Sequence, residues 1–228
     1  MPWQRRALSA IAVLTIAVAG QRMTLAAAGR EIEHARMACG DVPKPPVRLH
    51  LVDRAGLSAD AREELMREAL APWRAEGASL TWTAVMPTRP PGPGEPKDLY
   101  VFIEGDAGET ADLRHLPMAS ILFTNGQPTT HITIHAGHVA RRLATVRLDD
   151  RPLAEQPRMI RDRILGRVLG RAVAHEVGHF LFASREHESA GLMRASHRID
   201  HLMAPGHPAF RLRPAASAGC LVARGGGG

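Results

Sequence analysis

The pentapeptide HEVGH at residues 175–179 constrains the fold of this chain more than any other feature. It lies near the end of the longest helical pattern in the sequence, which covers residues 157–183. Side chains four residues apart on a helix leave the same face, so His175 and His179 come within reach of one metal ion. Glu176 points to the flank of this pair, where its carboxylate can take a proton from water without binding the metal. The pattern therefore predicts an open zinc site with about three protein ligands.

The other periodic segments place a sheet ahead of this helix. Residues 47–52 alternate between apolar and polar types, as a strand does. A helix follows, with Ser58 as its N-cap and its end near Gly77. Further strands are predicted at residues 79–85, at 98–105, near 120–124 and near 130–135. A tight turn at Asn125 and Gly126 joins the last two, and the expected order is strand, helix, four strands and the HEVGH helix.

This order of elements, together with HEVGH, resembles the amino-terminal half of metzincin-type zinc peptidases. The resemblance spans residues 47–193 by element order and is specific at the HEVGH helix. It implies an α+β, zincin-like fold: a mixed twisted sheet with an antiparallel edge strand, a backing helix and the HExxH helix of the active site. It also implies that His175 and His179 bind Zn²⁺ and that Glu176 is the catalytic base. The edge strand that pairs with an extended peptide substrate would consist of Ser120, Ile121, Leu122, Phe123 and Thr124.

The third ligand is where the chain departs from the family motif HExxHxxGxxH. Phe182 occupies the glycine position, and Arg185 occupies the position of the third histidine. A guanidinium group offers no lone pair, so Arg185 cannot bind a cation. His187 follows two residues later, and we expect an extra half turn of chain to bring it to the metal as the third ligand. Four other residues stay open as ligands, and a glutamate among them would make the site gluzincin-like: Glu186, Glu188, His197 and His201.

Met193, in the segment SAGLMRA, resembles the methionine of the metzincin Met-turn. In that family the methionine lies beneath the metal ligands without binding the ion, and Gly191 would permit the turn here. Methionine is also a common flexible filler of hydrophobic cores. Both interpretations of Met193 stay open from the sequence.

A second group of histidines, His131, His135 and His138, lies on or just past a predicted strand. His131 and His135 share one face of that strand because strand side chains alternate with a period of two. The group is consistent with a structural zinc site or with an exposed polar strand face. We favour the exposed strand face.

The first 28 residues have the pattern of an export signal: a basic start, an apolar run and an Ala-x-Ala cleavage site. The apolar run of 14 residues is shorter than the roughly 20 that span a bilayer, so no stable membrane span is expected. An uncleaved anchor is the alternative. We therefore expect an exported protein, periplasmic or secreted. Its expected parts are a signal peptide at 1–28, a Pro-rich segment at 29–46, a zincin-like domain at 47–215 and a disordered tail at 216–228.

Cys39 and Cys220 are the two cysteines of the chain, and both follow the predicted cleavage site. In an oxidising compartment they would form one disulfide that ties the start of the mature chain to its end. The segment CGDVP also distantly resembles the inhibitory cysteine segment of matrixin zymogens, in which a thiolate caps the zinc. We favour the disulfide, because few residues precede Cys39 in the mature chain.

The net charge of +6 does not by itself indicate a nucleic-acid partner, and we expect none. Basic residues are interleaved with acidic ones, and aromatic residues, at 4% of the chain, leave few platforms on which bases can stack. The densest basic stretch is expected to be the solvated side of a helix: Arg158, Arg161, Arg163, Arg167 and Arg171.

The sequence therefore predicts an exported zinc-dependent metallopeptidase that hydrolyses peptide bonds, with Glu176 as general base. Its partner would be a peptide or protein substrate, and we expect a monomer. Two alternatives stay open: a non-enzymatic exported zincin-like domain that binds a metal or a protein, and a hydrolase that acts on something other than protein. Glu176 beside an open ligand set favours the enzyme, because structural zinc sites are usually closed by four ligands.

Overall fold

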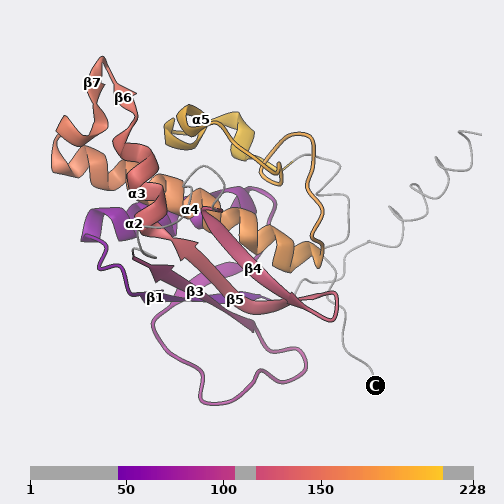
Figure 1. Ribbon diagram of the computed structural model, residues 1–228. Helices are drawn as coiled ribbons and strands as arrows, with labels where there is room; N and C mark the ends of the chain where they lie inside the picture. Colours follow the sequence, from indigo (N-terminus) through magenta and orange to yellow (C-terminus); the bar gives the residue numbers. More distant parts are fainter. Residues whose placement is uncertain (1–45, 106–116, 213–228) are drawn as a thin grey trace, which may run out of the picture.

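Figure 1 shows the computed structural model of the protein, which describes residues 46–105 and 117–212. The predicted signal peptide, almost all of the Pro-rich segment, Cys39, Cys220 and the predicted tail lie outside the described residues. Within the described ranges, no helix is both long enough and apolar enough to cross a lipid bilayer.

A mixed five-stranded sheet underlies the helices in Figure 1, with strand order β2-β1-β3-β5-β4. Its strands are β1 Val47–Asp53, β2 Leu80–Thr83, β3 Lys97–Glu104, β4 Ala119–Thr124 and β5 Gln127–His135. All neighbours pair in parallel except β4, which runs antiparallel to β5 and forms one edge. Asn125 and Gly126 take positive φ values of 52° and 75° in the tight turn between these two strands. The predicted α+β class, mixed sheet and antiparallel edge strand are therefore confirmed.

Two long helices, α2 at Ala59–Ala75 and α4 at Arg158–Phe182, lie against one face of the sheet. α2 begins where the sequence predicts, because the hydroxyl oxygen of Ser58 accepts a hydrogen bond from the amide of Ala61 at 3.2 Å. The structure also contains shorter elements that the sequence analysis missed. They are α3 Ala136–Ala144, β6 Arg147–Leu148, β7 Arg151–Pro152, η1 Leu153–Glu155, α5 Ile199–Met203 and η2 Pro208–Phe210.

The hydrophobic core lies between the sheet and these two helices. Leu99, Val101 and Ile103 of β3 are fully buried. Alternate side chains of a strand point to the same face of the sheet, so these three all face the core. Val173 and Val177 of α4, four residues apart, are equally buried. This packing fixes the rotation of α4 about its axis and hence the direction in which its histidines point.

α2 and α4 approach each other closely at two glycines of α4, Gly166 and Gly170. A Cβ atom built on Gly170 would lie 2.5 Å from the carbonyl oxygen of Leu65 and 2.8 Å from Cβ of Glu68. A Cβ atom on Gly166 would collide in the same way with the carbonyl group of Ala61. Glycine at both positions is therefore required for this helix pair to pack as it does.

We expect Gly170→Ala to lower the free energy of unfolding by about 2 to 3 kcal/mol, because α2 must move aside for the added methyl group. Urea unfolding followed by circular dichroism measures the change. Arg163→Ala, at an exposed position of the same helix, is the control and should shift stability by less than about 0.5 kcal/mol. A Gly170→Ala protein as stable as the parent would contradict the close approach of the two helices.

The basic stretch of α4 is not solvated along its whole length. Arg171 is 3% exposed and pairs with Glu68 of α2 at 2.9 Å, and Arg167 pairs with Glu64 at 2.7 Å. Arg171 also donates to two carbonyl oxygens of α5 at 2.8 and 3.0 Å. The prediction of a solvated face is wrong for these two arginines, because they face α2, where two glutamates compensate their charge. Together they connect α2, α4 and α5 beside the histidines.

Candidate metal centre

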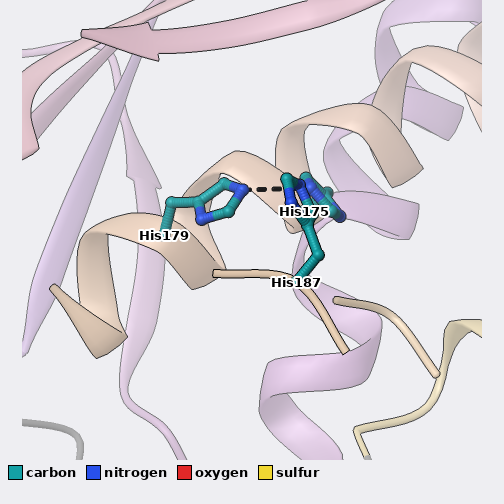
Figure 2. A group of neighbouring side chains, drawn as sticks. All are labelled: His175, His179 and His187. Carbon is teal, nitrogen blue, oxygen red and sulfur yellow. Dashed lines mark hydrogen bonds between the residues drawn. The ribbon is translucent and has the colours of Figure 1, made fainter. Parts of the chain in front are cut away.

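The structure brings His175, His179 and His187 together in the last turns of α4 and the segment that follows it (Figure 2). Their ligand nitrogens all lie within 4.8 Å of one another, and the Nε2 atoms of His175 and His179 are 3.1 Å apart. The ring centroid of His187 lies 5.2 Å from that of His175 and 4.9 Å from that of His179. In the part of the chain that the structure describes, this is the group of side chains that could hold a metal ion.

Backbone carbonyl groups determine which nitrogen of each helical histidine carries the proton. Nδ1 of His175 lies 2.9 Å from the carbonyl oxygen of Leu192, and Nδ1 of His179 lies 2.7 Å from that of Ser184. A carbonyl oxygen only accepts, so each Nδ1 donates. Burial lowers the pKa of His175 to about 4 and also lowers the pKa of His179, so both rings are neutral at pH 7. Each Nε2 therefore keeps a free lone pair, which is the form that binds a metal.

The end of α4 explains how His187 reaches the pair. The helix runs through Phe182, and Ala183 then takes the left-handed conformation, with φ 49° and ψ 37°. In the motif HExxHxxGxxH the glycine would be residue 182 and the third histidine residue 185. Here the left-handed residue is Ala183, one position later, and the third histidine is His187, two positions later. Arg185 does not join the histidines, because its guanidinium lies 4.7 Å from the ring centroid of Phe123 on β4.

Ala183→Gly is expected to stabilise the protein by about 0.5 to 1 kcal/mol, because glycine adopts the left-handed conformation without a Cβ clash. The metal ligands keep their backbone, so metal affinity should not change. Thermal unfolding measures the gain. Ala71→Gly, at an exposed position inside α2, is the matched control and should lose about 1 kcal/mol. Equal losses at both positions would rule out a left-handed Ala183.

The four rival ligands lie outside this group in the described part of the chain. The amide of Glu188 donates to the carbonyl oxygen of Met193 at 2.8 Å, which closes a turn. Nε2 of His197 lies 3.3 Å from a backbone carbonyl oxygen, and His201 stacks on His207 with ring centroids 4.1 Å apart. Within the described residues, the group that could hold a metal includes none of Glu186, Glu188, His197 and His201.

Glu176 lies beside the histidines but outside their group. It is 7% exposed, and its carboxylate accepts a hydrogen bond from the backbone amide of Ile121 on β4. Burial raises the pKa of Glu176 to about 7, and the hydrogen bond from Ile121 opposes this rise. A carboxyl group with a pKa near neutrality is well matched to general acid–base work.

Met193 packs directly against the HEVGH segment. A Cβ atom built on Gly178 would collide with the side-chain sulfur of Met193, so the methionine fills the space that this glycine leaves. Met193 is 3% exposed, and the turn before it uses Gly191 with φ of 79°. Leu192, between them, supplies the carbonyl oxygen that orients His175. Met193 is therefore a buried residue that packs against the helix segment carrying His175 and His179.

A cleft of about 740 Å³ opens over the histidines, within the usual size range of ligand sites. Ser120, Ile121, Leu122 and Phe123 of β4 line it, whereas Thr124, at the end of the strand, is not among the described lining residues. Residues 194–197 line the cleft as well. Among the described residues β4 is an edge of the sheet, so backbone groups on its outer side could pair with another extended chain. Two backbone groups of β4 already have partners: the amide of Ile121 binds Glu176, and the carbonyl oxygen of Phe123 accepts from Arg185 at 3.5 Å.

The second histidine group does not form a metal site within the described residues. His131 is exposed on β5 and stacks on the rings of Tyr100 and Phe102, with centroids 5.6 and 5.7 Å away. His138 lies in α3 and is 2% exposed. The expected exposed strand face therefore holds for His131 and is wrong for His138, because β5 ends at His135 and α3 begins immediately after it.

Three backbone groups complete the site, and sequence reasoning missed them. They are the carbonyl oxygens of Leu192 and Ser184, which orient two histidines, and the amide of Ile121, which binds Glu176. Every such residue carries an amide and a carbonyl group, so no residue type marks these positions in the sequence.

No protein-family model matches the chain, and no match was found among curated proteins. A fold class alone does not specify a function, which depends on the geometry and chemistry of the site.

Proposed function

We propose that the protein is an exported zinc-dependent metallopeptidase that hydrolyses peptide bonds. The observation that carries this proposal is the pair of neutral Nε2 atoms of His175 and His179, 3.1 Å apart, beside the buried carboxylate of Glu176. Two lone pairs at this distance repel each other, and a bound cation removes the repulsion. A metal beside a carboxylate of raised pKa, in a cleft bounded by a sheet edge, is suited to hydrolysis. Export rests on the leader-like pattern of residues 1–28.

The donor set fits zinc. Zinc binds imidazole nitrogen at about 2.0 to 2.1 Å in tetrahedral geometry, which separates two ligand nitrogens by about 3.3 Å. The observed separation of 3.1 Å is close to this value. His175, His179 and His187 would hold the ion and leave a fourth position open, as in catalytic rather than structural sites. Zinc would supply a Lewis acid there, which polarises a carbonyl group and increases the acidity of water.

Glu176 would act as the general base. Its carboxylate lies outside the metal-capable group, so it is free to take a proton from water and pass it to the leaving amine. The amide of Ile121 holds that carboxylate in position. Since Ile121 belongs to the edge strand, the strand that positions the base would also align an extended peptide through backbone hydrogen bonds.

A metzincin-like, zincin-type fold is part of this proposal. The mixed sheet, the antiparallel edge strand and the packing of Met193 against Gly178 of the HEVGH segment support it. The third ligand would be displaced from the position of Arg185 to His187, because α4 ends with its left-handed residue at Ala183.

Metal analysis combined with a peptide digest tests the proposal. The purified protein is analysed for zinc and incubated with a broad peptide library, whose cut sites are read by mass spectrometry. We expect stoichiometric zinc, and cleavage that a chelator removes and added zinc restores. Zinc without cleavage of any peptide would support the non-enzymatic metal-binding domain instead. A protein that binds no zinc would overturn the proposal.

A further inference from the structure

Three arginines that line the cleft have no carboxylate partner among the described residues: Arg142, Arg185 and Arg194. The fourth lining arginine differs from them, because Arg171 is paired with Glu68 of α2. Of the described residues that line the cleft, Glu176 is the one acid, and it is buried. Among the described residues, the lining of the cleft therefore carries more positive than negative charge.

Two of these arginines lie toward opposite ends of the edge strand. Arg185 lies at the Phe123 end of β4, over the ring of that residue. Arg142 lies on α3, which follows β5 at the other end of the pair, where Ala119 begins β4. Arg194 lies on the segment after α4 that also lines the cleft. Positive charge is thus present at both ends of the strand that binds the glutamate.

We propose that the cleft selects acidic peptides and that Arg142, Arg185 and Arg194 recognise their side chains. This inference rests on the proposed function, because the peptide is taken to lie extended along β4. Four residues of a strand advance about 13 Å, so acidic side chains on both sides of the bond beside Glu176 would meet guanidinium groups. A guanidinium group binds a carboxylate through two parallel hydrogen bonds, which suits this recognition.

A nucleic acid is the other polyanion that a basic cleft can attract. The described lining residues include two phenyl rings, Phe123 and Phe210, and Phe210 is 7% exposed. Single-stranded nucleic acids need open aromatic surfaces on which bases stack. The edge strand of a sheet, in contrast, matches the backbone of an extended peptide. The observations therefore favour an acidic peptide.

Two fluorescein-labelled decapeptides test the inference, and they differ only in that four glutamates of the first are glutamines in the second. They are titrated with zinc-loaded Glu176→Gln protein, which binds without cutting, and affinity is read by fluorescence anisotropy. The glutamate peptide is expected to bind about tenfold more tightly. Replacing Arg142, Arg185 and Arg194 together by glutamine should reduce this preference to about twofold or less.

Net charge alone would also attract acidic peptides, since the chain carries +6. The matched control therefore replaces three exposed arginines that do not line the cleft, Arg74, Arg151 and Arg163, by glutamine, and it should keep the preference. Equal affinity for the two peptides, or an equal loss in both triple variants, would overturn the inference. Tighter binding of a single-stranded oligonucleotide of equal charge, lost only in the cleft variant, would overturn it as well.

Failure of this inference and failure of the proposed function give different results. If the parent protein cuts library peptides with no bias toward acidic residues, the inference is overturned and the peptidase stands. If the glutamate peptide binds through the three arginines but the parent cuts no peptide, the inference stands as a binding property and the peptidase is overturned.

Discussion

Glu176→Gln is expected to slow peptide hydrolysis by about 1000-fold while zinc stays bound. The amide of glutamine cannot take a proton from water, and general acid–base groups typically contribute rate factors of this size. Zinc should remain because Glu176 does not belong to the group of three histidines. The fold should remain because a glutamine oxygen still accepts the hydrogen bond from Ile121, and a neutral side chain is easier to bury than a charged one.

Rates on a library-derived peptide, zinc content and a thermal melt are measured on the same preparation of this variant. Glu186→Gln, at an exposed position near the histidines but outside the metal-capable group, is the matched control and should keep the parent rate. Turnover of the Glu176→Gln protein within a few-fold of the parent, with zinc bound, would exclude Glu176 as the base. Loss of zinc from that variant would show instead that Glu176 is a ligand.

Long elements could be predicted from the sequence because packing one face of an element against the core requires apolar residues at a regular spacing. The HEVGH helix was expected over residues 157–183 and is observed at Arg158–Phe182. The shorter elements could not be predicted in this way. α5 has five residues, too few for a helical period to be visible, and two carbonyl oxygens of its chain are held by Arg171 from a distant part of the sequence. Tertiary contacts rather than local pattern stabilise such elements.

In the candidate site, too, local spacing could be predicted from the sequence and contacts made by the tertiary fold could not. His175 and His179 could be paired from spacing alone, because a helix converts a separation of four residues into proximity. His187 could be proposed as a ligand because Arg185 cannot bind a cation. Its position beside the pair depends on the left-handed conformation of Ala183, which the sequence does not predict because the residue is not a glycine. Arg142, Arg185 and Arg194 come from three separate segments, so their convergence on one cleft is a property of the fold.

His187→Ala is expected to weaken zinc binding by at least about 100-fold. Loss of an outer partner of a metal ligand already costs about 10- to 100-fold in affinity, and removal of a ligand itself should cost more. Competition with a chromophoric chelator measures this. His187 is exposed, so its loss should leave the stability of the metal-free protein close to that of the parent. His179→Ala is a less clean test, because His179 is 6% exposed and donates a hydrogen bond to Ser184.

Glu186→Ala and Glu188→Ala are the matched controls, since each removes a possible ligand that flanks His187 in sequence. Both should keep the parent affinity, because neither side chain belongs to the metal-capable group among the described residues. A Glu188→Ala protein that loses zinc while His187→Ala retains it would require the segment after α4 to rearrange, because the carboxylate of Glu188 lies outside the metal-capable group among the described residues. That result would replace the three-histidine site with one of two histidines and a glutamate. Parent-like affinity in all three variants would mean that the helical pair binds zinc with a ligand from elsewhere in the chain.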